Sequence, residues 1–169
     1  MENIILTGMP GCGKSTVGVI LAKTLGMDFI DTDLIIQIRE QDKLQNLVDK
    51  YGTDRFRVME EQALLSVTAR ENTVIATGGS AVFCEDGMEY LKESGICIYL
   101  EVSCEKLIKR LKNIKTRGIA AKKGMSVSDI FNERSPYYEK YADICIDCGD
   151  SSIEENIAKI IAAVSGGKG

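Results

Sequence analysis

Eight residues near the start of the chain, Gly8 to Ser15, follow the pattern G-x-x-x-x-G-K-[ST] without a gap. In this pattern the glycines let backbone N–H groups converge on the phosphates of a nucleotide. Lys14 is then expected to reach the β- and γ-phosphates, and the Ser15 hydroxyl to bind Mg²⁺. The predicted nucleotide contacts at this loop are Gly11, Cys12, Gly13, Lys14, Ser15 and Thr16.

Two aspartates follow a second apolar run, in the sequence Asp31-Thr32-Asp33. One interpretation makes either of them the N-cap of the next helix, a role that suits Asp33 well because the apolar run from Leu34 follows it directly. In the other interpretation Asp31 serves Mg²⁺, because the strand that ends at Thr77 carries no aspartate for that role. Asp33, two residues further along an extended segment and pointing the same way, would take a hydroxyl proton from an acceptor.

Three arginines are candidates for binding an anionic group, because arginine forms bidentate hydrogen bonds with carboxylates and phosphates. Each also has an ordinary interpretation: Arg57 could pair with a glutamate on its own helix, Arg117 could be a solvated loop charge, and Arg134 could lie on a solvated helix face. The chain has no histidine, so acid–base chemistry is left to carboxylates, lysine or water.

Composition restricts the class of protein. With 169 residues, of which 44% are hydrophobic, the chain is expected to form one domain over residues 1–165, followed by a frayed tail at 166–169. A net charge of −4 argues against nucleic-acid partners and favours small anions. We expect a cytoplasmic monomer, because we find neither a signal peptide nor a membrane span. Its six cysteines would stay reduced, and the C-x-x-C at Cys145 and Cys148 lacks a second pair for zinc.

Short apolar runs alternate with amphipathic segments along the chain, which predicts a parallel sheet of about five strands covered on both faces. The expected strands are 3–7, 27–30, 73–77, 95–102 and 143–147. The expected helices are 16–25, one from about 34, 44–51, 54–70, 85–93, 103–112, one from Ser126 to about 140, and one from Ser151 to about 164. Capping boxes are expected at Ser126 with Asp129 and at Ser151 with Glu154. The polar, basic segment 113–125 is typical of a mobile surface lid.

Ligands of such sheets bind beyond the carboxyl ends of the strands. This rule brings together the phosphate loop, Asp31-Thr32-Asp33 and Gly78-Gly79-Ser80.

Taken together, these residues resemble the shikimate kinases over essentially the whole length of the chain. The matching motifs are the loop Gly8 to Thr16, Asp31-Thr32-Asp33, Phe56-Arg57-Val58-Met59-Glu60 as F-R-x-x-E, Ala76-Thr77-Gly78-Gly79, Arg117, and Arg134 followed by Pro136-Tyr137-Tyr138. Their order and spacing match as well as the residues. The resemblance implies a three-layer α/β P-loop kinase fold with a mobile lid.

The resemblance also implies an activity, the ATP-dependent phosphorylation of the 3-hydroxyl of shikimate with Mg²⁺. Asp33 would act in catalysis with Lys14 and with Arg117 on the lid. The acceptor would be held by Asp33, Arg57, Gly78, Gly79 and Arg134. Ser15 and Asp31 would serve the metal, and Arg110 would flank the adenine.

Two positions depart from the family pattern. Ser80 stands where a third glycine is usual, and Gly118 stands where a proline usually follows the lid arginine. Two alternatives therefore remain open: a kinase of the same fold that acts on another small hydroxy acid, polyol or nucleoside monophosphate, and a nucleotide-binding module without catalysis.

Overall fold

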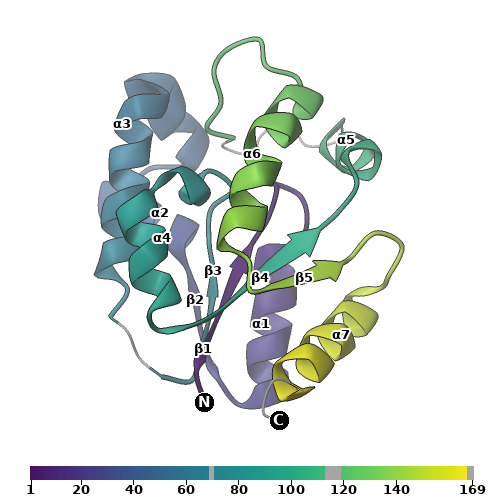
Figure 1. Cartoon of the computed structure of the whole chain (residues 1–169). Coiled ribbons are helices and arrows are strands. Elements are labelled where there is room, and N and C mark those ends of the chain that lie inside the picture. The colour runs from purple at the N-terminus through teal and green to yellow at the C-terminus, as the bar shows by residue number, and fades with distance from the viewer. Residues whose placement is uncertain (69–70, 113–118, 167–169) are drawn as a thin grey trace.

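A computed structural model describes residues 1–68, 71–112 and 119–166 of the chain (Figure 1). Its centre is a five-stranded sheet, parallel throughout, with the strand order β2-β3-β1-β4-β5. The strands are β1 (Asn3–Thr7), β2 (Asp28–Asp31), β3 (Thr73–Ala76), β4 (Gly95–Glu101) and β5 (Ile144–Asp147). The helices are α1 (Lys14–Leu25), α2 (Thr32–Glu40), α3 (Leu44–Ser66), the short 3₁₀ helix η1 (Ala81–Phe83), α4 (Glu85–Lys92), α5 (Cys104–Lys112), α6 (Val127–Tyr141) and α7 (Ile153–Gly166).

The strand order explains why helices cover both faces of the sheet. The connection from β1 to β2 runs toward one edge, whereas the later connections run toward the other. Because crossovers between parallel strands are right-handed, α1 lies on one face, where it packs against α7, and α3, α4 and α6 lie on the opposite face (Figure 1). Every residue of β1 and β3 is buried as a result. The prediction of a doubly covered parallel sheet is confirmed.

Several helix boundaries in the structure differ from the predicted ones. The helix expected to start near Leu34 begins at Thr32, because Asp31 is its N-cap. The two helices expected at 44–51 and 54–70 are the two parts of α3, which breaks at Gly52, where φ is 78°. The second part ends at Ser66 instead of Arg70, because Val67 has the extended backbone angles φ −66° and ψ 102°.

The two predicted capping boxes have different outcomes. Ser126 and Asp129 form the expected box at the start of α6. At α7 the box is one residue later than predicted: Ser152 Oγ accepts the Glu155 N–H at 3.1 Å, and Glu155 accepts the Ser152 N–H at 2.7 Å. The helix then continues to Gly166, which was expected to belong to a frayed tail.

The predicted lid segment lies partly outside the described residues. Arg117 and Gly118 fall in the range 113–118, which the structure does not describe. Within 119–125, Ala120 is buried in a small apolar cluster with Ile36 and Phe56, contrary to the expectation of a surface position. In the described part of the chain, none of the helices combines the length and hydropathy needed to cross a membrane.

Candidate functional site

The phosphate loop connects β1 to α1 at the carboxyl edge of the sheet. Its backbone requires glycine at Gly11 and Gly13, where φ is 85° and 102°, in the region that side chains rarely adopt. Gly13 is the N-cap of α1, so the first N–H groups of that helix point out beside the loop. This arrangement is a ready anion-binding site.

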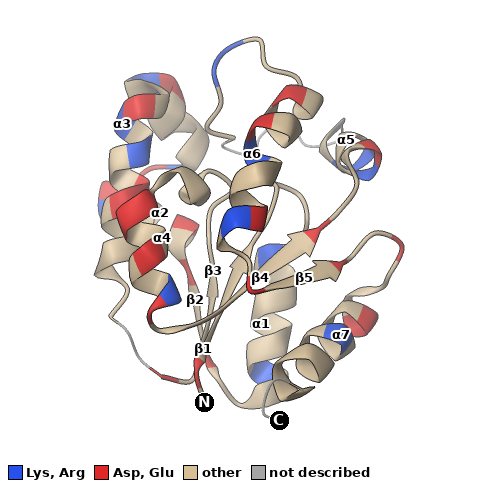
Figure 2. Ribbon diagram, viewed as in Figure 1, with Lys and Arg blue, Asp and Glu red and all other residues tan. Residues whose placement is uncertain are grey.

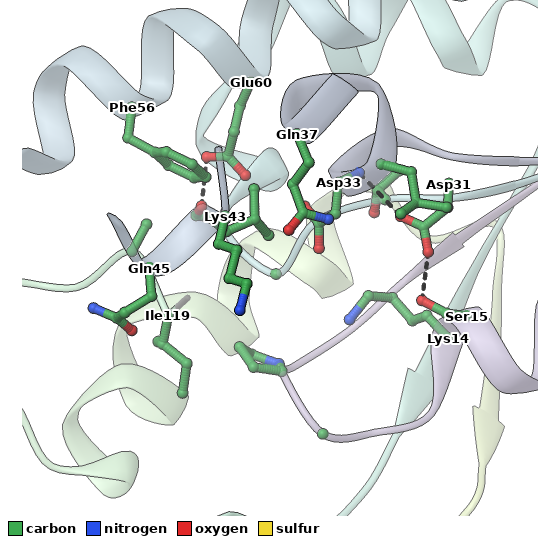
Figure 3. A pocket seen from close by; sticks show the side chains of 18 of the residues that line it. Lys14, Ser15, Asp31, Asp33, Gln37, Lys43, Gln45, Phe56, Glu60 and Ile119 are labelled. Atoms are coloured by element: carbon green, nitrogen blue, oxygen red, sulfur yellow. Dashed lines mark hydrogen bonds between the residues drawn. The ribbon is translucent and has the colours of Figure 1, made fainter. Parts of the chain in front are cut away.

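Lys14 lies along the inside of this loop and is only 8% exposed. Its Nζ donates to the carbonyl oxygens of Gly8 at 2.7 Å and Met9 at 3.1 Å. The same side chain lines the cavity next to the loop, where Figure 3 shows it extending into the central space. A positive charge therefore stands beside the N–H groups that would receive phosphate.

Ser15 and Asp31 meet from two different elements. The Ser15 hydroxyl, in the first turn of α1, donates to Asp31 Oδ2 at 2.6 Å at the end of β2 (Figure 3). Hydroxyl and carboxylate oxygens are the ligands that Mg²⁺ takes in nucleotide sites. The pair predicted for the metal is thus brought together, and it fits a magnesium ion beside the phosphate loop.

The two aspartates after β2 have different surroundings. Asp31 Oδ1 accepts the N–H of Asp33 at 3.0 Å, so Asp31 is the helix cap and Asp33 is not. The chain is already helical at Asp33, so the two side chains do not follow one extended segment as expected from the sequence. Asp33 nevertheless lines the cavity with Asp31 and Lys14.

The cavity has a volume of about 490 Å³ and lies between the phosphate loop, α2, α3, the turn after β3, and α6. Charged side chains of both signs line it, among them Lys14, Lys43, Asp31 and Glu60 (Figure 3). The predicted site residues that line it are Gly11, Gly13, Lys14, Ser15, Thr16, Asp31, Asp33, Gly79 and Arg134.

Two carboxyl groups lie on the same side of the cavity, Glu60, which is buried, and Asp33, which is half-buried. Desolvation and, second to it, the neighbouring charge of Asp31 raise the pKa of Asp33 from 3.8 to about 6, against the opposing effect of Lys14. Burial also raises the pKa of Glu60 from 4.5 to about 8. Perturbed carboxyl groups that line a cleft are typical of sites that move protons.

The turn Gly78-Gly79-Ser80 is held from three directions. The N–H of Gly78 donates to Thr32 Oγ1 at 3.2 Å, and Tyr138 of α6 donates its hydroxyl to the carbonyl of Gly79 at 2.5 Å. Ser80 donates to Glu60 of α3. Glycine is needed at Gly78, because an added Cβ would lie 2.7 Å from Asp33 Oδ1. The turn therefore places its backbone close to the cavity.

Arg134 and Arg57 both lie close to one aromatic ring, that of Phe83. Arg134 is only 1% exposed, and its terminal nitrogen donates to the carbonyl of Ala120 at 2.5 Å, while its Nε has no hydrogen-bond partner among the described residues. Its guanidinium carbon is 5.7 Å from the centre of the Phe83 ring. Arg57 lies over the same ring at 4.4 Å, but it lines a second, more open hollow beside Phe83 instead of the main cavity.

The remaining predicted residues surround the cavity. Arg110 of α5 donates to the carbonyl of Gly11 at 3.4 Å and so lies next to the phosphate loop. Cys12 is buried beneath that loop, where its Sγ would lie 2.9 Å from a Cβ at Gly8. Neither lines the cavity, and Arg117 lies outside the described residues.

Several cavity residues received no role from the sequence. Glu60 and Phe56 belong to the F-R-x-x-E motif, which is the signal that could have marked them. Lys43 precedes α3 and reaches into the cavity with Gln37 of α2 (Figure 3), and nothing in the local sequence distinguishes it from a surface lysine.

Comparisons with known proteins point to one family. The family model described as shikimate kinase matches residues 10–165. The shikimate kinase of Thermodesulfovibrio yellowstonii is 36% identical over 163 residues, which cover 95% of this chain and 94% of that protein. That of Haemophilus influenzae is also 36% identical over 163 residues, covering 95% and 91%.

Solved structures show the same likeness. The shikimate kinase of Acinetobacter baumannii, in complex with shikimate, superposes with a TM-score of 0.91 at 30% identity, covering 99% of this chain and 95% of that one. The shikimate kinase of Aquifex aeolicus gives a TM-score of 0.83 at 30% identity, with 98% and 97% covered.

Proposed function

This chain belongs to the shikimate kinase family, and we propose that its main cavity is where ATP phosphorylates the 3-hydroxyl group of shikimate. ATP-dependent phosphorylation of shikimate is the reaction of the family. The observation that carries the assignment of the cavity is that Lys14 of the phosphate loop and Arg134 of α6 line the same space. A group that binds phosphate and a group that binds a carboxylate therefore face one volume.

In the proposed reaction, the oxygen of the 3-hydroxyl bonds to the γ-phosphorus of ATP. The bond between that phosphorus and the β,γ-bridging oxygen breaks, ADP leaves, and Asp33 takes the hydroxyl proton. A pKa of about 6 suits this role, because Asp33 is then ionised at neutral pH and still close to the operating pH. Lys14 would stabilise the negative charge on the phosphoryl group as it moves.

Ser15 and Asp31 are proposed to hold Mg²⁺, Ser15 directly and Asp31 through water. When bound, the ion would neutralise charge on the β- and γ-phosphates. The support for this assignment is the contact of 2.6 Å between the two side chains next to the phosphate loop. The hydrogen bond from Asp33 N to Asp31 Oδ1 keeps the other oxygen of Asp31 turned toward Ser15.

Arg134 is proposed to bind the carboxylate of shikimate. Its Nε is buried and has no hydrogen-bond partner in the part of the chain that the structure describes, and such a donor gains most from an anionic ligand. We propose that Arg57 assists from its position beside Phe83 and that the backbone of Gly78 and Gly79 contacts the ring of the acceptor. Two hydrogen bonds support this proposal because they fix the turn beside the cavity: the Gly78 N–H donates to Thr32, and the Tyr138 hydroxyl donates to the carbonyl of Gly79.

Two further arginines are proposed to contact the nucleotide. Arg110 would flank the adenine, and Arg117, which lies outside the described residues, would approach the phosphates on the lid.

We also propose a monomeric cytoplasmic enzyme with residues 1–165 as one domain and no nucleic-acid or membrane partner. The net charge of −4 and the mixture of both charges over the helices support the proposal on nucleic acid (Figure 2).

A coupled assay of ADP release tests the acceptor. We expect turnover with shikimate and much lower turnover with nucleoside monophosphates, which have no carboxylate for Arg134. Turnover should also be lower with quinate and gluconate, whose carboxylate and hydroxyl groups are arranged differently from those of shikimate and would not meet Arg134 and Asp33 together. A preference for gluconate or a nucleotide would contradict the assignment of shikimate. ATP binding without turnover on any acceptor would instead favour the non-catalytic alternative.

Asp33→Asn and Lys14→Met test the chemistry of the cavity. Each should lower kcat by about 10²-fold or more, the scale of lost proton transfer or charge stabilisation. Circular dichroism and thermal unfolding would establish that both variants fold. Near-normal turnover in a folded Asp33→Asn variant would contradict the proposed role of Asp33 in catalysis. A loss of turnover could not be attributed to a lost helix cap, because Asp31 is the cap of α2.

A further inference from the structure

Ser80 carries the only side chain of the turn Gly78-Gly79-Ser80 that follows β3. Its backbone is ordinary, with φ −98° and ψ 0°, and the residue is 3% exposed. Its hydroxyl does not project freely into the cavity. Instead it donates to Oε2 of Glu60, which lies on α3, 20 positions earlier in the chain. One oxygen of Glu60 is thereby fixed by a neighbour that belongs to a different element.

The second oxygen of Glu60 faces Asp33. An added Cβ at Gly78 would lie 2.8 Å from Glu60 Oε1 and 2.7 Å from Asp33 Oδ1. The two oxygens are therefore at most about 5.5 Å apart, the sum of these distances, which is within the range where like charges disfavour each other. With the Ser80 hydroxyl donating to Oε2, a proton on Glu60 is placed on Oε1, on the side of Asp33.

The surroundings of Glu60 disfavour its ionised form. The residue is 3% exposed, and among the described residues no lysine or arginine forms an ion pair with it. Asp33 of α2 opposes its charge, whereas Arg134 of α6 and Arg57 of α3 favour it. The Ser80 hydroxyl also favours the charged form, because a donated hydrogen bond is stronger to a carboxylate than to a neutral acid.

From this geometry we propose that Ser80 is a positioning residue: it orients the Glu60 carboxyl group and sets the pH at which that group becomes charged, and so controls how well the cavity binds an anionic acceptor. The inference rests on the proposed function of the cavity. A neutral Glu60 leaves Arg134 free to bind the acceptor's carboxylate. An ionised Glu60 competes for Arg134 and repels the acceptor.

A direct test reads the protonation of Glu60 without any substrate. In protein labelled with ¹³C at the glutamate side-chain carboxyl, the signal of Glu60 is identified by its loss in Glu60→Gln and is followed from pH 5 to 10. In Ser80→Ala and Ser80→Gly its midpoint should move upward by about 0.5 pH units or more, because a donor to the carboxylate is lost. Ser80→Thr, which keeps the hydroxyl, should restore the wild-type midpoint.

A kinetic test measures how the charge of Glu60 affects binding of the acceptor. In the wild type, the KM for shikimate should rise severalfold above about pH 8, where Glu60 ionises. Ser80→Ala should move this rise to higher pH, and Glu60→Gln should remove it. Ser135→Ala is the matched control, because its hydroxyl also donates within the protein, to the carbonyl of Phe131 at 2.7 Å, but Ser135 does not line the cavity. Its pH profile should equal that of the wild type.

An unchanged Glu60 midpoint in both folded Ser80 variants would overturn the proposal, and so would a downward shift. If the midpoint shifts but the KM profile does not follow it, the control over the acceptor is disproved. Failure of the proposed function would look different: no acceptor turnover at any pH, with the Glu60 titration still responding to Ser80.

Discussion

Arg134 and Arg57 both approach the ring of Phe83, yet only Arg134 lines the main cavity. We therefore expect the two arginines to contribute unequally to binding the acceptor's carboxylate. Arg134 is fixed by its bond to Ala120 and by burial, which lowers the entropy that it loses when it binds a ligand. Arg57 is half-buried, and it lines the second hollow beside Phe83.

Alanine variants of the two arginines should separate these roles. We expect Arg134→Ala to raise the KM for shikimate by about 10²-fold, because a charge-assisted contact to a carboxylate is lost. Arg57→Ala should raise it by about tenfold or less. ATP affinity, measured by calorimetry, should change little in either. A larger effect from Arg57→Ala than from Arg134→Ala would contradict this order, and thermal unfolding would detect any loss of packing at the buried Arg134.

The raised pKa of Glu60 predicts a pH dependence of stability. Between its ordinary value of 4.5 and about 8, the folded protein holds a proton on Glu60 that the unfolded chain releases. Stability must therefore fall as pH rises through this window. Glu60→Gln, which cannot ionise, should show a shallower fall between pH 6.5 and 8 in chemical unfolding. Equal slopes for both proteins would mean that Glu60 is ionised in the folded state at neutral pH.

At the scale of elements, either of two adjacent serines at the start of α7 could form the capping box of that helix. Both Ser151-x-x-Glu154 and Ser152-x-x-Glu155 satisfy the pattern. In the structure, Ser152 forms both bonds of the box, and Ser151 instead accepts from Lys159 Nζ at 2.6 Å. The helix begins at Ile153, and Ile157 and Ile160 lie on its buried face. The local pattern alone therefore does not distinguish the two serines, and only the structure shows that Ser152 is the cap.

Ser152→Ala and Ser151→Ala form a matched pair. Ser152→Ala should lower the free energy of unfolding by about 1 kcal/mol, the usual cost of losing an N-cap. Ser151→Ala should change it by less than about 0.5 kcal/mol, as expected for a surface hydroxyl. Urea unfolding followed by circular dichroism measures both. The reverse order would place the start of the helix one residue earlier.

On the scale of the whole molecule, Tyr138 links the helical layer to the acceptor site. It lies on α6, stacks on Tyr99 of β4 with ring centres 5.2 Å apart, and donates to the carbonyl of Gly79. Gly79 in turn lies against the phosphate loop, because a Cβ there would be 2.7 Å from Pro10. One side chain therefore connects α6, the sheet, the turn after β3 and the nucleotide loop.

Tyr138→Phe tests whether this connection matters for function. It should lower the free energy of unfolding by about 1 kcal/mol and also raise the KM for shikimate, because the carbonyl of Gly79 loses its partner. Tyr90→Phe is the control, since its hydroxyl donates to the carbonyl of Val67 at 2.9 Å, away from the cavity. Tyr90→Phe should cost similar stability without changing KM. If the two variants have equal KM values, the turn is positioned without Tyr138.

Features encoded by neighbouring residues could be predicted from the sequence. The phosphate loop, the alternation of strands and helices, the box at Ser126 and the break at Gly52 depend on backbone preferences over a few positions. The rule for parallel sheets then brought Lys14, Ser15, Asp31 and Asp33 to one edge, because the carboxyl ends of parallel strands meet there.

Only the tertiary structure decided which side chains touch across elements. The bonds from Ser80 to Glu60, from Tyr138 to Gly79 and from Arg134 to Ala120 join residues 20, 59 and 14 positions apart. It also showed that Asp31, and not Asp33, caps α2, and that Arg57 lies beside Phe83. Such contacts depend on how helices pack against the sheet and on which rotamers fit that packing, and neither follows from spacing along the chain.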